Sequence, residues 1–239
     1  MHPTVKAARV AGLLYLVMGL PAPFALIYLP GKLIVRGNAA ATANNILASE
    51  MLFRIGIVAE LITAVFFVLL VMALYSLLSG VNKTHARVMV GLVLASVAVT
   101  FVNVLNNIAA LTLFRGADYL YLSVFEKPQR DALAMLFLGL HSQGTFVNEI
   151  FWGLWLLPFG LLVMRSGFLP RILGVLLIVN GFAYVAISLT WLLLPSYGNL
   201  AFQASMPALL GELWIMLWLL IKGAKAQPLA APASSSAGG

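Results

Sequence analysis

Six long stretches of the chain consist almost entirely of apolar residues. They run approximately over residues 10–29, 51–78, 88–114, 142–165, 171–194 and 207–222. A helix needs about twenty apolar residues to cross the roughly 30 Å hydrocarbon core of a bilayer. The strands of a membrane barrel instead alternate apolar and polar residues over about ten positions. Because these stretches do not alternate, and lipid permits only helices or closed barrels, the pattern predicts an all-α, polytopic membrane helix bundle with about six transmembrane helices.

Two segments between these spans predict one or two further helices, both on the outer side of the membrane. Residues 30–50 indicate an extended stretch followed by a short helix at the interface. Residues 128–141 begin with proline, which is favoured at the first position of a helix, and place apolar residues three and four apart. They form either a separate interfacial helix or an extension of the fourth span. Within the first span, Pro21 and Pro23 predict a kink or a break, because proline removes a backbone donor.

The composition is that of a chain surrounded by lipid. It is 62% hydrophobic and only 9% charged, with a mean hydropathy of +1.03, whereas a soluble domain carries about 25% charged residues. Residues 1–222 are therefore expected to form a single transmembrane domain. The first span lacks a clear signal-peptide cleavage motif, so we expect it to be a true span. Residues 223–239 are expected to form a disordered, low-complexity tail.

The basic residues lie at the ends of the spans. The net charge is +7 and the isoelectric point is about 9.9. The bases nevertheless occur in twos and threes, without the continuous stripe that binds phosphates, which argues against nucleic acid as a partner. With a cytoplasmic N-terminus, eight of the fourteen bases and no acid fall on the cytoplasmic side, and the positive-inside rule then places both termini in the cytoplasm. These eight are Lys6, Arg9, Lys83, Arg87, Arg165, Arg171, Lys222 and Lys225.

The side chains exclude several kinds of chemistry. The chain has no cysteine, which excludes disulfides, thiolate catalysis and cysteine metal sites. The three histidines, His2, His85 and His141, are far apart in the sequence and form no zinc-binding pair. The sequence has neither a nucleophile elbow nor a phosphate-binding aspartate cluster, which disfavours hydrolysis and prenyl-diphosphate chemistry. We therefore expect no metal and no cofactor.

Three glutamates, Glu60, Glu149 and Glu212, interrupt the apolar spans. An acid inside hydrocarbon costs several kcal/mol and is seldom retained without a partner or a function. The helical rise of about 1.5 Å per residue places them, with four asparagines and a histidine, in the outer half of the bilayer. We expect them to converge on a polar pocket that opens outward and has aromatic walls. The candidate ligand-binding residues are Glu60, Asn103, Asn106, Asn107, His141, Asn148, Glu149, Trp152 and Glu212.

These residues also have a purely structural interpretation. Asparagines in membrane helices commonly form interhelical hydrogen bonds, which contribute about 0.6 kcal/mol on average. A glutamate can be protonated and bonded to a neighbouring carbonyl, and His141 can simply be solvated at the interface. Tyrosine and tryptophan near helix ends are typical of the interfacial aromatic belt. Gly91 and Ala95, one turn apart on the third span, indicate a helix-packing face.

Three segments of the sequence resemble a known family. They are GKLIVRGNAAATANNILASEMLFR at residues 31–54, LFLGLHSQG at residues 136–144 and RSGFLPRILGVLL at residues 165–177. Together they make the chain similar, over roughly residues 6–222, to the bacterial integral-membrane family called domain of unknown function 4386. The resemblance implies a six-helix protein of the bacterial inner (plasma) membrane, and it implies no established activity.

Three functions remain open from the sequence. The first is a protein that binds a hydrophobic or amphipathic small molecule or lipid in the predicted pocket and couples its transport to protons, which requires a cavity and titratable acids. The second is an intramembrane acid–base enzyme of the cyclase or isomerase type acting on a lipid or isoprenoid, with a glutamate as acid and a second acid or His141 as base. The third is an accessory or assembly subunit. Membrane lipid is an expected partner, and oligomerisation is left open.

Overall fold

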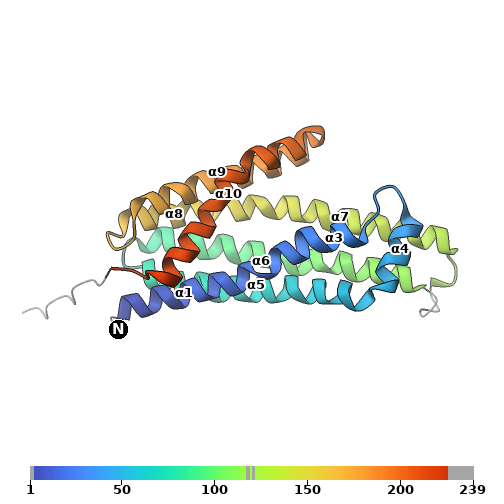
Figure 1. Cartoon of the computed structure of the whole chain (residues 1–239), viewed down its shortest axis with the longest axis horizontal. Helices are drawn as coiled ribbons and strands as arrows, with labels where there is room; N and C mark the ends of the chain where they lie inside the picture. Colours follow the sequence, from blue (N-terminus) through green and yellow to red (C-terminus); the bar gives the residue numbers. More distant parts are fainter. Residues whose placement is uncertain (1–2, 117–118, 120–121, 226–239) are drawn as a thin grey trace, which may run out of the picture.

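The computed structural model describes residues 3–116, 119 and 122–225, and all regular secondary structure in these residues is helical. The helices form an elongated bundle (Figure 1). Six segments are long and apolar enough to cross a membrane: Thr4–Leu33, Glu50–Leu78, Lys83–Arg115, Lys127–Arg165, Arg171–Leu193 and Pro195–Ile221. The prediction of an all-α bundle with about six membrane spans is therefore confirmed. From residue 226 onward, the predicted tail lies outside the described residues.

The first span remains helical through its prolines. Its segments are α1 (Pro3–Gly19), α2 (Pro21–Pro23), the π-helix η1 (Phe24–Tyr28) and α3 (Leu29–Leu33). The regular α-helical pattern is interrupted beside the prolines, at Leu20, as predicted, and the chain then continues as a helix whose hydrogen bonds change their spacing. The N–H of Phe24 donates to the carbonyl of Pro21, and the N–H of Leu29 donates to the carbonyl of Phe24. A short π-helical turn of this kind is often found at functional sites.

A short helix, α4 (Ala39–Ala48), lies at the end of the bundle opposite the N-terminus (Figure 1). It begins after Asn38, whose Oδ1 accepts a hydrogen bond of 2.9 Å from the N–H of Ala41. Such a cap satisfies one of the backbone donors that the first turn of a helix leaves free. The segment between α3 and α4 is not helical. The predicted non-helical stretch and short helix are therefore observed, although α3 occupies the first part of residues 30–50.

The second and third spans are single helices, α5 (Glu50–Leu78) and α6 (Lys83–Arg115). On α5, exposed apolar side chains recur every three or four residues and so share one face. These are Met51, Ile55, Val58, Ile62, Val65, Leu69 and Met72. The stripe is roughly 32 Å long at about 1.5 Å per residue. It is therefore long enough to face the hydrocarbon core of a bilayer.

The fourth span combines α7 (Lys127–Leu154) and α8 (Leu156–Arg165) and contains 39 residues. At about 1.5 Å per residue it is roughly 58 Å long. It begins with a capping box, in which the side chain of Gln129 accepts a 2.9 Å hydrogen bond from the N–H of Glu126. Residues 128–141 continue directly into the span. Of the two alternatives for this segment, the extension of the fourth span is therefore correct.

The last two spans are α9 (Arg171–Leu193) and α10 (Gly198–Ile221), joined by the short 3₁₀-helix η4 (Pro195–Tyr197). α10 packs against α9 and then crosses α1 (Figure 1). It begins earlier than the predicted span, because Pro207 lies inside the helix and not at its start. Glu212 therefore lies nearer to the C-terminal end of α10. The placement of Glu212 in the outer half of the membrane stays a prediction.

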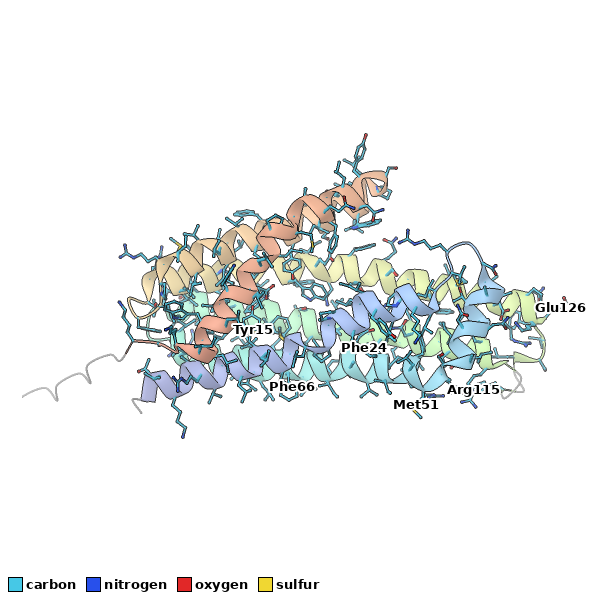
Figure 2. All side chains as sticks on the ribbon, viewed as in Figure 1. Tyr15, Phe24, Met51, Phe66, Arg115 and Glu126 are labelled. Carbon is cyan, nitrogen blue, oxygen red and sulfur yellow. The ribbon has the colours of Figure 1, made fainter. Side chains whose placement is uncertain are left out.

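The two ends of the bundle differ in charge. The start of α1, the α5–α6 turn, the α8–α9 turn and the end of α10 lie at one end (Figure 1). This end carries the eight bases that the sequence places on the cytoplasmic side, and we call it the basic end. The opposite end, which we call the α4 end, holds Met51, Arg115 and Glu126 (Figure 2). The buried apolar residues form two clusters, one toward each end.

Candidate functional site

A layer of polar side chains separates the two apolar clusters. On α5, α6 and α7, the cluster toward the basic end stops several residues short of the cluster toward the α4 end. The residues in the gap include Glu60 on α5, Asn103 on α6 and His141 on α7. Because α6 packs against both α5 and α7, this layer brings together side chains from three spans.

Glu60 lies at the centre of the layer. Its Oε2 is 2.9 Å from Nε2 of His141, and its Oε1 accepts a hydrogen bond of 3.3 Å from Nδ2 of Asn107. The side chains of Glu60 and His141 are each 13% exposed. One carboxyl group therefore joins α5 to both α6 and α7.

Asn103 extends the layer along α7. Its Nδ2 donates to the backbone carbonyl of His141 at 2.9 Å, and its Oδ1 accepts from Nδ2 of Asn106 at 3.2 Å. This close approach requires glycine at position 144, because a Cβ on Gly144 would lie 2.1 Å from Oδ1 of Asn103. Further toward the basic end, Asn148 Nδ2 donates to Thr100 Oγ1 at 2.9 Å. The layer thus connects α6 and α7 at two levels.

A cavity of about 50 Å³ adjoins the polar side chains of Glu60, Asn107 and His141. Its remaining walls are mostly apolar and come from η1, α3, α5 and α7; they include Ala25, Leu29, Leu33, Phe53, Ile57 and Leu138. The π-helical turn therefore forms part of the wall. About 10–15 Å³ of such space holds one water molecule, so the cavity has room for several waters or a small head group. Sites for drug-sized molecules begin at about 300 Å³.

A second polar group lies deeper in the bundle, around Glu212 of α10. The hydroxyl of Tyr15 donates to Oε1 of Glu212, and Nδ2 of Asn180 donates to Oε2 at 3.4 Å. Tyr184 interacts electrostatically with the same carboxyl group. Tyr15 lies where α1 passes α10 (Figure 2). We call these four residues the Glu212 group.

Glu149 and Trp152 lie beside the Glu212 group and not in the Glu60 layer. The rings of Trp152 and Tyr184 meet edge to face with centroids 6.0 Å apart, and Glu149 interacts electrostatically with Tyr184. Glu149 is 9% exposed, and its Oε2 has no hydrogen-bond partner. The nine predicted site residues are therefore divided. Six of them belong to the Glu60 layer, namely Glu60, Asn103, Asn106, Asn107, His141 and Asn148, whereas Glu149, Trp152 and Glu212 lie in or beside the Glu212 group.

A larger hollow, of about 220 Å³, lies between α5 and α6 toward the α4 end. Arg54, Arg115 and Tyr119 line it together with apolar side chains such as Ile108. Oε1 of Glu50 is 2.7 Å from Nε of Arg54 and 3.3 Å from Nη1 of Arg115.

Sequence reasoning missed Tyr15 and Tyr184 as members of the polar groups. A tyrosine within an apolar helix is most simply a core or interfacial residue, and nothing in the spacing along α1 indicates a partner on α10. The sequence does point to Asn180, because it is an amide deep inside an apolar span. In the described part of the chain, His, Cys, Asp and Glu side chains nowhere gather in groups of three or more that could hold a metal ion.

The fold and the polar side chains inside it define a multi-pass helical membrane protein. The family model described as Domain of unknown function (DUF4386) matches residues 10–223, and the chain belongs to this family. The predicted resemblance is therefore confirmed. No curated protein and no solved structure matches the chain.

Proposed function

We propose that this protein binds a hydrophobic or amphipathic small molecule or lipid at the cavity beside Glu60. The observation that carries the proposal is the composition of that cavity, in which a carboxyl group, an imidazole and an amide adjoin walls that are otherwise mostly apolar. Ligand sites commonly combine mostly apolar walls with a few polar groups that fix orientation. The same residues would also be costly to keep in a membrane if they served no purpose.

The chemistry of the cavity favours a ligand with a cationic or hydrogen-bond-donating head. Glu60 and Asn107 supply acceptor oxygens, and the apolar part of the ligand would contact Leu29, Ile57 and Leu138. Because the volume is only about 50 Å³, a larger ligand requires the first span to move away from α5. The π-helical turn η1 borders the cavity and is the natural place for that movement. Exchange of a proton for the ligand at Glu60 would couple binding to transport.

A second candidate function is intramembrane acid–base catalysis on a lipid or isoprenoid. It is favoured by the 2.9 Å contact between His141 and Glu60 at the edge of a cavity, because a pair of titratable groups in one site can divide the roles of general acid and general base. Both functions use the same residues. They differ in whether the bound molecule is changed.

We further propose that the protein lies in a bacterial inner membrane with both termini in the cytoplasm. The support is the charge of the basic end, where eight bases and no acid gather in the sequence. Short cytoplasmic loops of membrane proteins carry such an excess of lysine and arginine.

The test is native mass spectrometry of the protein purified in a mild detergent, to detect a co-purifying molecule. We expect Glu60→Gln and His141→Gln to lose this molecule, since both remove polar groups from the cavity. Glu126→Gln and His85→Gln, which change the same residue types away from the cavity, should retain it. Conversion of the molecule by the wild type, abolished in Glu60→Gln, identifies the enzyme. If neither cavity variant alters binding, the site is wrong and the role of an accessory subunit is favoured.

A further inference from the structure

Glu149 and Glu212 are the two acids within the described membrane spans for which no contact with a basic side chain is observed. Glu50 forms ion pairs with Arg54 and Arg115, Asp131 forms one with Lys127, and Glu60 lies 2.9 Å from the imidazole of His141. In the sequence, every lysine and arginine lies at or near the end of a span. An isolated carboxylate in a medium of low dielectric constant costs tens of kcal/mol. These two groups therefore need a positive charge that the chain itself does not supply.

The surroundings of Glu212 are rich in oxygen atoms. Its carboxyl group meets the hydroxyls of Tyr15 and Tyr184 and the amide of Asn180. Asn180 is 0% exposed, and its Oδ1 has no hydrogen-bond partner. Oδ1 and the donating Nδ2 belong to the same side-chain amide, so the unpaired oxygen lies within one amide group of the contact between Nδ2 and Glu212. A buried acceptor left unpaired costs about 1–3 kcal/mol.

Tyr184 connects this arrangement to Glu149. Tyr184 interacts electrostatically with both Glu212 and Glu149, and its ring packs against Trp152. Oε2 of Glu149 is the second buried oxygen of this neighbourhood without a hydrogen-bond partner. Side-chain oxygens from α1, α7, α9 and α10 therefore belong to this neighbourhood.

We propose that Glu149, Asn180, Tyr184 and Glu212 form a cation site, separate from the Glu60 cavity, that takes up a proton or Na⁺. Oxygen ligands without sulfur or nitrogen acceptors select hard cations. Tyr15 is the facing titratable group from α1, Tyr184 the one from α9 and Glu149 the one from α7. One bound proton or Na⁺ would neutralise the negative charge of one carboxylate. The unpaired oxygens of Asn180 and Glu149 are the contacts that the incoming cation would make.

The position of the site suits an ion that enters from one side of the membrane. At about 1.5 Å per residue, Glu212 lies roughly 14 Å from the end of α10 at the basic end, whereas Glu60 lies roughly 27 Å from the corresponding end of α5. The two carboxyl groups are therefore at different depths. The cation site does not depend on the ligand proposed for the Glu60 cavity.

The experiment measures the midpoint temperature of thermal unfolding for the full-length protein in detergent. NaCl replaces choline chloride at constant ionic strength, and the series is repeated at several pH values. If Na⁺ fills the site, the midpoint of the wild type rises by several degrees with Na⁺, because a ligand that binds only the folded state stabilises it. If a proton fills it, Na⁺ has no effect and the midpoint rises as the pH falls. Either response should fall at least twofold in Glu212→Gln and in Glu149→Gln and persist in Glu126→Gln, a control whose exposed side chain lies at the α4 end, away from both polar groups.

Infrared difference spectroscopy supplies a reading that does not depend on stability. Raising the pH, or adding Na⁺ at constant pH, should remove a carboxyl C=O band of the wild type, and this band should be absent from Glu212→Gln or Glu149→Gln. Should a glutamine variant fail to fold, Tyr184→Phe tests the same site. A midpoint and a carboxyl band that respond to neither cation, or that respond equally in wild type and in both glutamine variants, would overturn the proposal.

Discussion

At the scale of single residues, the bundle is held in register by carboxyl groups that accept from more than one helix. Glu60 of α5 meets side chains of α6 and α7, and Glu212 of α10 meets side chains of α1 and α9. An interhelical hydrogen bond in a membrane contributes only about 0.6 kcal/mol on average. A carboxyl group with several partners concentrates several such contributions, and leaves several groups unpaired when it is removed.

The first residue-scale prediction concerns the contact between Glu60 and His141. We expect a double-mutant cycle with Glu60→Gln and His141→Gln to give a coupling free energy of about 0.5–2 kcal/mol, because each group is the other's partner at 2.9 Å. The measurement is the free energy of unfolding in mixed micelles. A cycle between Glu60→Gln and Glu212→Gln serves as the control and should be additive, since the two groups share no contact. Additive behaviour of Glu60 and His141 would contradict the observed contact.

The second residue-scale prediction concerns the tyrosines of the Glu212 group. Tyr15→Phe removes a hydrogen-bond donor to the buried carboxyl group and Tyr184→Phe removes a hydroxyl that interacts with it, and each should lower the free energy of unfolding by about 1–2 kcal/mol. Tyr75→Phe is the matched control, because Tyr75 is partly buried in the same apolar cluster and lies outside the group. It should change stability by less than about 0.5 kcal/mol. Equal effects at all three positions would show that the hydroxyl contacts are unimportant.

At the scale of helices, glycines set the closest contacts. Gly153 and Gly160 of the fourth span face Gly181 and Gly174 of α9, and a Cβ on any of the four would approach a backbone oxygen to between 2.4 and 2.7 Å. Gly91, the glycine singled out from the sequence, is exposed, and a Cβ added there would have nothing within 4 Å. The predicted packing face on the third span was therefore wrong within the described chain.

The element-scale prediction follows from this contact. Gly181→Ala should lower the free energy of unfolding by about 1–3 kcal/mol, because its Cβ would lie 2.7 Å from the carbonyl oxygen of Gly153 and the two helices would have to separate. Gly139→Ala is the control, since Gly139 is an exposed helical position with nothing near a Cβ. It should be neutral or stabilising by up to about 1 kcal/mol. The measurement is equilibrium unfolding in detergent, and a tolerated Gly181→Ala would contradict the predicted clash.

The helix ends show what the sequence could and could not predict. α9 was predicted almost to the residue, because Arg171 and Pro195 interrupt the apolar pattern on both sides. The start of α10 was not predicted correctly, because residues 198–206 mix polar and apolar side chains. A proline such as Pro207 is also favoured at the start of a helix. Among the polar residues, the four-residue spacing of Asn103 and Asn107 predicts that they share one helix face. The partners of Glu212 on α1 and α9 could not be predicted, since contacts between distant helices leave no periodicity along either helix.

At the scale of the whole molecule, the separation of charge between the two ends predicts the topology. The chain has no cysteine, so a single introduced cysteine is a unique label. In intact bacterial cells, a membrane-impermeant maleimide should label Lys127→Cys at the α4 end and leave Lys83→Cys at the basic end unlabelled. Both should be labelled after the cells are opened, which controls for reactivity. Labelling of Lys83→Cys alone in intact cells would mean that the protein is inserted the other way round.

The unequal lengths of the spans have a consequence for the membranes that suit this protein. The fourth span, at roughly 58 Å, exceeds any natural bilayer core, whereas α9 measures only about 35 Å. Cellular membranes differ in thickness by a few ångströms. The long rod can absorb such differences simply by protruding more or less into water. The hairpin of α9 and α10 has far less spare length, so adaptation to thicker lipid falls mainly on that hairpin changing its tilt.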